Sequence, residues 1–438
     1  MVLGRCREAL VRGDDADVIV VGAGPGGAAT AHYLALTGLQ VLLLEKGTFP
    51  RDKVCGDGLT PRAVAELIRM GVSIEESDGW IRNWGLRTYG AGHRIELPWP
   101  ELAEMPNYGL ARSRMNLDET LARHAVASGA VLREGTAVTG PVRDERSGRI
   151  LGVTAKPVDP SGRRAGEDVT YRAPLVVDAG GVSARLATAM GIEKDMNRPM
   201  GVAVRTYFKS PRHDDPMMES HLELWDGKPG ESNLMPGYGW IFALGDGTVN
   251  VGLGSLSPTA KAMNLDYKGL FRTWMRNAPE EWELTEENQV ADLRSAALPM
   301  AFNRKPHYTK GLFLVGDSGG MVSPFNGEGI AYAMQSGRIA ADVISQALAR
   351  PSAYGREKAL RTYPKILSDE LGGYYTLGRA FAHLIGRPEI MRFCVKYGLP
   401  RPVLMRFVMK LLSDGFDRRD GDWMDRLITT MTKVVPAA

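Results

Sequence analysis

The chain has 438 residues, of which 44% are hydrophobic and 24% charged, and its net charge is +3. This composition is typical of a soluble globular protein with two or three structural units, and the weak charge gives no support for nucleic-acid binding. Three widely spaced cysteines argue against a disulfide framework or a cysteine-rich metal site and favour a reducing, cytoplasmic location. Residues 1–16 show no secretory signal, and no apolar stretch of the sequence reaches the roughly 20 residues that span a bilayer.

The first predicted elements are a buried strand at Asp17–Val21 and a helix at Ala28–Leu36, joined by a glycine-rich turn. In that turn, Gly22 permits a tight bend, Gly24 lets the backbone approach a pyrophosphate, and Gly27 lets the helix pack on the strand. The helix N-terminus would direct its N–H groups and its dipole at phosphate oxygens. The segment predicts a dinucleotide site, with an ordinary strand–helix turn as the alternative. The residues assigned to this turn are Gly22, Ala23, Gly24, Pro25, Gly26 and Gly27.

An acidic residue, Glu45, ends the next predicted strand, Gln40–Leu44. It lies about 20 residues beyond the glycines, where a carboxylate accepts hydrogen bonds from ribose hydroxyls. The same carboxylate would repel a 2′-phosphate, so we do not expect NADP at this turn.

Short elements follow in the middle of the chain. A hairpin is predicted at Trp84–Tyr89 and Arg94–Leu97, and a helix at Leu117–Ser128 with Gly129 as its stop. Further strands are predicted at Ile150–Lys156, Asp168–Arg172, Leu175–Asp178, Val202–Phe208, His221–Trp225, Gly239–Leu244 and Thr248–Leu253. The first two of these strands flank a turn-rich connection at 159–162, and a Gly-Asp-Gly turn joins the last two as a hairpin.

A second strand and turn occur near residue 315. Leu312–Val315 is predicted as a buried strand, and Asp317 lies at its carboxyl end, where ligands bind in open α/β sheets. Asp317 could hold ribityl hydroxyls or only cap a helix. Pro324–Gly329 then leads into a predicted helix at Ile330–Ala349, whose N-terminus would face the pyrimidine edge of a flavin and favour its reduction. Together with the first turn, this segment predicts bound FAD and therefore a redox enzyme.

The order of these elements predicts an α/β fold. A Rossmann-like FAD-binding domain is interrupted by a mainly antiparallel β substrate domain and followed by a helical C-terminal region. The FAD-binding domain is assigned to residues 1–78, 105–198 and 290–350, the β-rich domain to 79–104 and 199–289, and the helical region to 351–438. Since one glycine fingerprint of this type is present, NAD(P)H would have to visit the same flavin, or a ferredoxin or quinol would supply the electrons.

Three motifs resemble the geranylgeranyl reductase family of flavoproteins, within the p-hydroxybenzoate hydroxylase-like superfamily. They are FPRDKVCGDGLTP at 49–61, GYGWIF at 237–242 and the stretch Gly316–Gly329. The resemblance is closest to the actinobacterial menaquinone reductases, which saturate a double bond in the isoprenyl tail of menaquinone. It implies FAD-dependent reduction of a polyprenyl lipid, with geranylgeranyl diphosphate or geranylgeranyl lipids as alternative substrates. It also implies that the cofactor is contacted by Lys46, Cys55, Gly56, Arg114, Val138, Gly327 and Gly329, in addition to Glu45 and Asp317.

Two positions depart from the family pattern. Ala243 follows Phe242 where the family usually has proline, which bears on the shape of a substrate tunnel. Gly180 stands where the superfamily usually has aspartate, which removes a polar residue thought to serve the dinucleotide. We still expect tight binding of FAD.

Three aromatic residues, Tyr238, Trp240 and Phe242, alternate along a predicted strand, so their side chains project to one face. Reduction of an isolated trisubstituted alkene needs a proton on one carbon and a hydride, from flavin N5, on the other. Aromatic faces stabilise the cationic character that develops, by roughly 2 kcal/mol in a dry site. We therefore assign Tyr238 and Trp240 to catalysis and all three residues to substrate binding, with packing of the β-domain core as the alternative.

The third candidate catalytic residue is Cys55, in a glycine-rich loop near the expected position of the flavin ring. Its thiol could donate the proton or only shape the pocket, and Lys53 could lower the thiol pKa. A buried structural cysteine is the alternative. The seven histidines are scattered along the sequence, so neither a competing catalytic triad nor a metal site is predicted.

Near the end of the chain, Val403–Leu412 has the pattern of an amphipathic helix, with Arg406 and Lys410 four residues apart on one face. Such a helix could lie on an anionic bilayer with its cations at the head groups, or pack on the FAD domain as a core helix. The sequence therefore allows peripheral contact with the inner face of the cell membrane.

Two other functions stay open. One is an oxygen-dependent hydroxylase or halogenase of the same superfamily, although the halogenase motif Trp-x-Trp-x-Ile-Pro differs from the stretch that begins at Tyr238. The other is a prenyl-lipid carrier that holds FAD structurally. Turnover without oxygen would separate a reductase from both.

Overall fold

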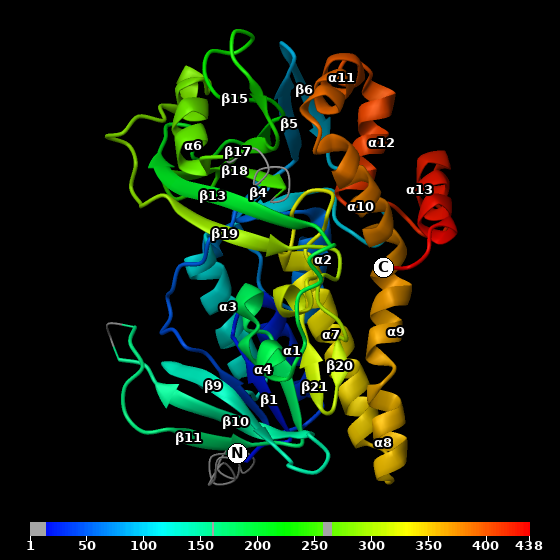
Figure 1. Cartoon of the computed structure of the whole chain (residues 1–438). Coiled ribbons are helices and arrows are strands. Elements are labelled where there is room, and N and C mark those ends of the chain that lie inside the picture. The colour runs from blue at the N-terminus through cyan, green and yellow to red at the C-terminus, as the bar shows by residue number, and fades with distance from the viewer. Residues whose placement is uncertain (1–14, 160–161, 257–264) are drawn as a thin grey trace.

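The computed structural model describes residues 15–159, 162–256 and 265–438, so the predictions on residues 1–16 and 159–162 fall wholly or partly outside it. Its centre is a six-stranded sheet (Figure 1). The strand order is β20-β21-β12-β1-β2-β8, at Tyr308–Thr309, Leu312–Leu314, Leu175–Asp178, Val18–Val21, Val41–Leu44 and Val131–Arg133. Neighbouring strands are parallel except β20 and β21. The four apolar runs predicted as buried strands in this part of the chain therefore lie side by side.

The two faces of this sheet are covered by different layers, because successive residues of a strand point to opposite faces. Val20 packs in one apolar cluster with residues of α1 (Pro25–Leu36) and α7 (Ile330–Leu348). Ile19 packs on the other side against the sheet β11-β10-β9, at Val169–Arg172, Ile150–Pro157 and Thr136–Arg143. This layered arrangement confirms the predicted Rossmann-type fold.

Several smaller elements surround this core. The short sheet β3-β7-β4 has strands at Gly58–Leu59, Gly109–Ala111 and Ile81–Asn83. The helices α2, α3 and α4 lie at Pro61–Met70, Arg114–Ala127 and Arg185–Ala189. α3 starts three residues before the predicted helix and ends before Gly129, whose φ of +113° stops it.

The second large sheet has seven strands in the order β19-β13-β18-β17-β14-β5-β6. They lie at Arg294–Pro299, Met200–Lys209, Thr248–Leu256, Tyr238–Ala243, Met218–His221, Gly85–Gly90 and His93–Pro98, and the helix α6 (Tyr267–Arg276) packs on them. Every neighbouring pair is antiparallel except β14 and β5. In Figure 1 this sheet and α6 lie above the six-stranded layer.

One predicted strand, His221–Trp225, is wrong. β14 ends at His221, and Leu224–Trp225 forms β15, which pairs with β16 (Leu234–Met235) in a separate sheet. Between them, the carboxylate of Glu223 accepts a hydrogen bond from Ala91 N at 2.8 Å, at the tip of the β5–β6 hairpin. The chain therefore leaves the seven-stranded sheet between His221 and Leu224.

The strand β19 differs from the expected division of the chain. It lies within residues 290–350, which the sequence analysis assigns to the FAD-binding domain, but it pairs with β13 of the seven-stranded sheet. Its central residues are small or apolar and match the register of β13, with Leu298 opposite Gly201. The chain thus returns to the nucleotide-binding layer only after this strand.

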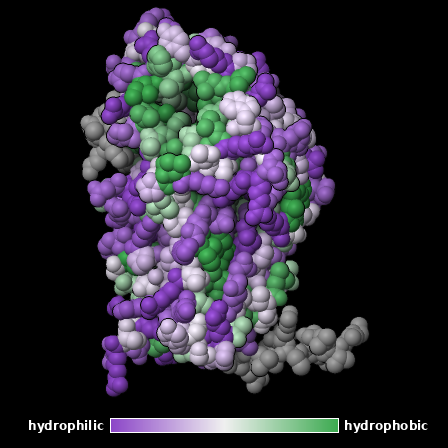
Figure 2. Space-filling model, turned by 90° about the vertical axis from the view of Figure 1, so that its right-hand side faces the viewer, coloured by the Kyte–Doolittle hydropathy of each residue, from purple (hydrophilic) through white to green (hydrophobic). Residues whose placement is uncertain are grey.

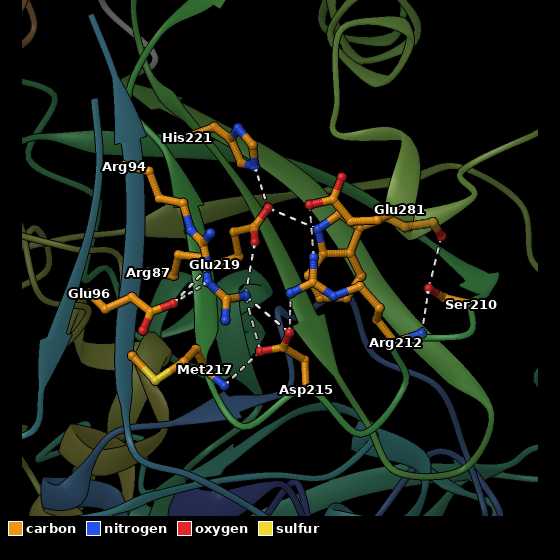
Figure 3. A network of polar contacts seen from close by, with 11 residues as sticks. Arg87, Arg94, Glu96, Ser210, Arg212, Asp215, Met217, Glu219, His221 and Glu281 are labelled. Atoms are coloured by element: carbon orange, nitrogen blue, oxygen red, sulfur yellow. Dashed lines mark hydrogen bonds and ion pairs between the residues drawn. The ribbon is translucent and has the colours of Figure 1, made fainter. Parts of the chain in front are cut away.

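A buried network of charged side chains connects strands near one edge of the seven-stranded sheet (Figure 3). Arg87 on β5 donates to Asp215 at 3.0 Å and to Glu219 on β14 at 3.3 Å. Glu219 pairs in register with Ile241, the neighbour of Trp240 on β17. Since neighbours on a strand face opposite sides, the charged network and Trp240 lie on opposite faces of the sheet.

The C-terminal region is helical, as the sequence predicts, and runs along one side of the molecule (Figure 1). The helices α8 to α13 lie at Ala353–Leu360, Tyr363–Leu367, Gly373–Ile385, Pro388–Gly398, Pro402–Leu412 and Trp423–Val434. A π-helical turn at Ser368–Gly372 connects α9 and α10. Among the residues that the structure describes, no helix has the length and apolar character needed to cross a bilayer.

The predicted amphipathic helix is α12, but its two cations lie in different environments. Arg406 is exposed. Lys410 is buried, and its ammonium contacts Asp422 at 2.8 Å and Asp425 at 2.7 Å. The prediction that both cations lie at lipid head groups is therefore wrong for Lys410. A spacing of four places two residues on one side of a helix, but it does not tell which neighbouring helix covers one of them.

Candidate functional site

The turn after β1 forms an open cradle at the start of α1. Gly22 has a φ of +96°, and a Cβ on Gly27 would overlap the carbonyl oxygen of Gly22, so both positions require glycine. Over Gly24 there is space, because the nearest atom to a Cβ there would be Nη2 of Arg114 at 3.8 Å. α1 begins at Pro25, three residues earlier than predicted, so its free N–H groups follow directly on the open turn. This geometry fits the pyrophosphate of a dinucleotide.

Buried at the end of β2, Glu45 organises the same turn. Its carboxylate accepts hydrogen bonds from Ala23 N and Gly47 N, both at 2.9 Å. Arg51 donates to Glu45 at 2.9 Å and to Asp118 at 2.8 Å. Arg51 is not among the predicted site residues, although it lies in the Phe-Pro-Arg run of the family motif, six residues after Glu45.

Two other residues predicted to contact the nucleotide lie near Glu45. Lys46 is exposed in the next position. Val138 is on β9, two residues after Thr136, whose N–H donates to the Glu45 carbonyl oxygen at 2.8 Å. Their contacts with the cofactor stay a prediction.

Arg114, at the start of α3, lies between the glycine turn and the Cys55 loop. Its guanidinium is buried and donates to both carboxylate oxygens of Asp118, at 2.6 and 2.8 Å. Its backbone N–H donates to Asp57 at 3.2 Å. Arg114 therefore connects the position of the pyrophosphate with the loop that carries the candidate thiol.

The environment of Cys55 differs from the expected one. Burial raises the pKa of the Cys55 thiol, and this effect outweighs the lowering of that pKa by the Arg114 guanidinium. Lys53 has a smaller effect, and its ammonium pairs with Asp317 at 3.3 Å. Lys53 does lower the pKa of this thiol, as predicted, but burial outweighs this contribution and the net shift of the pKa is upward.

The rings of Tyr238, Trp240 and Phe242 form a row on one face of β17. Their centroids are 6.2 and 6.3 Å apart along the row. The Trp240 ring lies over Gly252 of β18, where any Cβ would overlap it. The Tyr238 hydroxyl donates to the carbonyl oxygen of Asn326 at 2.6 Å, so the row is tied at this end to the loop before α7.

The Cys55 loop packs against the other end of this aromatic row. A Cβ on Gly56 would lie 3.2 Å from the Phe242 ring and 3.4 Å from Trp240 Nε1. Asn250 on β18 holds the two parts together: its Oδ1 accepts from Trp240 Nε1 at 2.9 Å, and its Nδ2 donates to the Cys55 carbonyl oxygen at 2.8 Å. Segments that are almost 190 residues apart in the chain thus form one wall.

Asp57 is a buried acid that the sequence analysis did not single out. Its carboxylate accepts hydrogen bonds from Tyr207 at 2.7 Å and from Asn250 at 2.9 Å. Burial raises the pKa of Asp57 to about 6, against the lowering effect of these two hydrogen bonds. The sequence does contain a signal for Asn250: it is a polar residue in the otherwise apolar centre of a strand, and buried polar groups need hydrogen-bond partners.

The second predicted half of the site lies at the end of β21. Asp317 is in a short 3-10 helix at Gly316–Gly319, directly after the strand. Gly327 lies beside the aromatic row, because its Cβ position is 3.6 Å from the Tyr238 hydroxyl. Gly329 immediately precedes the first residue of α7, as the sequence predicts. The two glycine-rich turns follow the carboxyl ends of β1 and β21. Because these strands run in the same direction through β12, both turns lie at the same edge of the central sheet.

A buried arginine next to the Cys55 loop leaves polar atoms without partners. Arg205 on β13 is fully buried, and its Nη2 donates to the Lys53 carbonyl oxygen at 3.1 Å and also contacts Asp52. Its Nε and Nη1 have no hydrogen-bond partner among the described residues. Unpaired buried N–H groups are rare in proteins. Together with the open cradle over Gly24, they fit a polar cofactor such as FAD against this wall.

The carboxyl of Glu328, between Gly327 and Gly329, should make the stability of the protein depend on pH. Its Oε1 accepts from Thr60 at 2.7 Å, its Oε2 is buried without a partner in the described part of the chain, and burial raises the Glu328 pKa to about 7. The unfolded chain ionises this carboxyl at lower pH, so its contribution to stability is present at pH 5 and is lost as the pH rises through 7. We expect the stability of Glu328→Gln relative to wild type to increase by up to about 3 kcal/mol between pH 5 and pH 8.

Thermal unfolding of both proteins across that pH range measures this difference. The control is Glu145→Gln, because Glu145 is exposed on the surface. The stability difference between this variant and wild type should be the same at every pH. A constant difference for Glu328→Gln as well would contradict the assignment of a raised pKa to this carboxyl.

Known proteins similar in sequence to this chain include an FAD-binding family and two reductases. The family model described as FAD binding domain matches residues 15–365. Menaquinone reductase from Mycobacterium tuberculosis (strain ATCC 25618 / H37Rv) is 35% identical over 414 residues, which cover 94% of this chain and 95% of that protein. Digeranylgeranylglycerophospholipid reductase from Methanocella arvoryzae is 30% identical over 362 residues, which cover 81% and 83%.

Solved structures share the fold at lower identity. A geranylgeranyl bacteriochlorophyll reductase-like protein from Thermoplasma acidophilum superposes with a TM-score of 0.74 at 22% identity and covers 95% of this chain and 99% of that one. The flavin-dependent brominase Bmp2 superposes with a TM-score of 0.71 at 20% identity, covering 96% and 98%. At these identities the likeness concerns the fold alone.

Proposed function

Because this chain belongs to the FAD-binding flavoproteins that include the menaquinone and geranylgeranyl-lipid reductases, we propose that it saturates a C=C bond in a polyprenyl chain. The chain is an FAD-dependent oxidoreductase of that family. We propose the isoprenyl tail of menaquinone as its substrate, since the relative with this activity covers almost the whole chain at 35% identity.

The contact between the Cys55 loop and the aromatic row carries this proposal. It places a thiol loop against Trp240 and Phe242, while Tyr238 connects the same row to the loop before α7. An apolar chain lying along these rings would pass between the two halves of the flavin site.

When bound and reduced, FAD supplies the hydride for one carbon of the double bond. Before the hydride arrives, the chain's own residues must deliver a proton to the other carbon and stabilise the positive charge that this proton leaves on the carbon that will accept the hydride. We assign the charge stabilisation to Trp240 and Tyr238, whose ring faces attract cations. We assign the proton to Sγ of Cys55, which the raised pKa of the thiol keeps protonated.

The test is a single turnover without oxygen. The purified holoenzyme is reduced chemically and mixed in parallel with menaquinone and with geranylgeranyl diphosphate, both dispersed in detergent. The proposal expects menaquinone to gain two mass units while the flavin is reoxidised. If only geranylgeranyl diphosphate were reduced, the assignment of menaquinone as the substrate would be wrong. If neither compound were reduced, the proposed reductase function would be contradicted.

Oxygen-dependent chemistry is the second candidate function, because flavin-dependent halogenases share the fold. The same experiment separates the two functions, since a hydroxylase or halogenase would not reoxidise its flavin on an alkene under anaerobic conditions. Product formation that appears only after oxygen is admitted would favour this second candidate.

Cys55→Ser tests the proton donor. If the Cys55 thiol donates, the flavin should be reoxidised by the lipid about 100-fold more slowly, because a serine hydroxyl is a far weaker acid. Stopped-flow absorbance of the flavin measures this step directly. The exposed cysteine on α11 provides the matched control, Cys394→Ser, which should react at the wild-type rate. An unchanged rate for Cys55→Ser would assign the proton to another group.

A further inference from the structure

Five apolar side chains are exposed on the helices α10, α11 and α12. They are exposed by between 43% and 65% and comprise Leu384, Phe393, Tyr397, Val403 and Leu404. The rings of Phe393 and Tyr397 are in contact, with centroids 4.9 Å apart. A Cβ on Gly398 would lie 3.9 Å from Leu404, so the end of α11 and the start of α12 present one continuous surface. We refer to the four residues on α11 and α12, namely Phe393, Tyr397, Val403 and Leu404, as the α11–α12 face.

The opposite side of α11 is already covered by the protein. Val395 and Leu399 are buried and pack so closely on β5 that a Cβ on Gly90 would overlap Val395. The apolar residues of the α11–α12 face therefore belong to the outer side of a helix pair whose inner side is occupied. Figure 2 shows hydrophobic side chains gathered around a hollow near the top of this side of the molecule, at the height of α11 and α12 in Figure 1.

Positive charge is concentrated around this face. Residues 387–406 include five Lys or Arg and one acidic residue, Glu389, whereas the whole chain has a net charge of only +3. All five cations are exposed: Arg387, Arg392, Lys396, Arg401 and Arg406. Apolar side chains surrounded by cations are what an anionic lipid surface binds, because the apolar groups enter the acyl boundary while the cations stay at the phosphates.

The same helix pair leads to the candidate site. On the inner side of α12, Met405 and Met409 pack in one apolar cluster with Met218 and Phe242. Phe242 in turn lies against Gly56 of the Cys55 loop. A continuous path of apolar side chains thus runs from the exposed start of α12 to the aromatic row.

We infer that the α11–α12 face seats the enzyme on an anionic bilayer and that the polyprenyl chain leaves the bilayer along α12 to reach Phe242. This inference rests on the proposed function, which requires a substrate that resides in lipid. A second copy of the chain fits this face poorly, because a symmetric contact would bring the same cations of the two copies together.

The experiment compares the holoenzyme with the double variant Phe393→Glu/Leu404→Glu in sedimentation with lipid vesicles. The vesicles contain phosphatidylglycerol and phosphatidylcholine in equal parts, or phosphatidylcholine alone. Wild type should sediment with the anionic vesicles and should be released at high salt, because screening weakens the attraction of the cations. The double variant should bind at least about tenfold more weakly, since two apolar contacts become charges of the same sign as the lipid.

A control replaces a more exposed aromatic residue far from this face, in Tyr354→Glu on α8, where Tyr354 is 80% exposed. It should bind vesicles as wild type does, and all variants should unfold at the wild-type temperature. Equal loss of binding in the control, binding to neutral vesicles alone, or no binding by wild type would overturn the inference. So would a concentration-dependent dimer that the double variant abolishes, because a second copy would then occupy the face.

Turnover with detergent-dispersed menaquinone keeps the two proposals apart. The double variant should lose far more activity on lipid held in anionic vesicles than on the dispersed lipid. Vesicle binding without any reduction would contradict the proposed function and leave the membrane contact standing. Reduction in detergent without vesicle binding would contradict the membrane contact alone.

Discussion

Gly27→Ala is expected to yield a protein that does not retain FAD. The Cβ of an alanine at this position would overlap the carbonyl oxygen of Gly22, and it would also come within 3.2 Å of the Ala179 side chain. The oxygen belongs to the turn that we predict to approach the pyrophosphate, and Gly22 in this turn has a φ of +96°, which residues with a side chain rarely adopt. Forcing a methyl group into such a contact costs roughly 3 kcal/mol, which corresponds to about a 100-fold weaker affinity if it falls on the binding-competent state.

The ratio of flavin to protein absorbance after gel filtration measures this effect, and thermal unfolding of the apoprotein shows how much falls on the fold itself. Gly140→Ala on β9 is the matched control, since its Cβ would meet the Thr154 hydroxyl at 3.6 Å, an ordinary contact. The control should retain the full complement of FAD. Retention by Gly27→Ala as well would show that the turn does not hold the cofactor.

Trp240→Ala is expected to lower turnover by about 30-fold while FAD stays bound. Loss of one cation-stabilising ring removes roughly 2 kcal/mol from the stabilisation of the charged transition state, and that energy corresponds to this factor. The variant should also unfold at a lower temperature, because Trp240 is buried over Gly252 and its removal opens a cavity. The rate of flavin reoxidation by the lipid, measured well below the unfolding temperature, separates the two effects.

Trp240→Phe distinguishes ring chemistry from positioning. It keeps an aromatic face but removes the indole N–H, which donates to Asn250 at 2.9 Å. A reduction of less than about tenfold would support stabilisation of charge by the ring. A loss as large as that of the alanine variant would instead assign Trp240 the task of holding the Cys55 loop through Asn250. Trp423→Ala, on the exposed side of α13, is the control and should not change turnover in detergent.

The nucleotide end of the site could be predicted because its signals are local. Gly22, Gly24 and Gly27 are separated by a few residues, and the backbone requirements that select glycine there act within one turn. The same applies to Glu45, whose spacing from the turn reflects a single βαβ unit. Arg51 was missed, although it is only six residues further, because no periodicity marks an arginine in a loop.

The proposed substrate end of the site could be predicted only in part. The alternation of Tyr238, Trp240 and Phe242 correctly places three rings on one face of a strand. The residues that position them, Asn250 and Asp57, come from other segments, and their pairing depends on how β18 and the Cys55 loop meet. The net upward shift of the Cys55 pKa could not be predicted for the same reason, since the burial that outweighs the lowering by Lys53 is a long-range property.

The sequence by itself determined the class of cofactor and the strands, turns and helices of the candidate site, because hydrophobic periodicity and glycine requirements are set by neighbours within one strand, turn or helix. Only the tertiary structure decided which side chains face one another. It placed Gly56 against Phe242, turned Lys410 inward to Asp422 and Asp425, and left Phe393 and Leu404 exposed among cations. Such contacts depend on packing between segments that are distant in the chain, and the local pattern of residues carries no record of them.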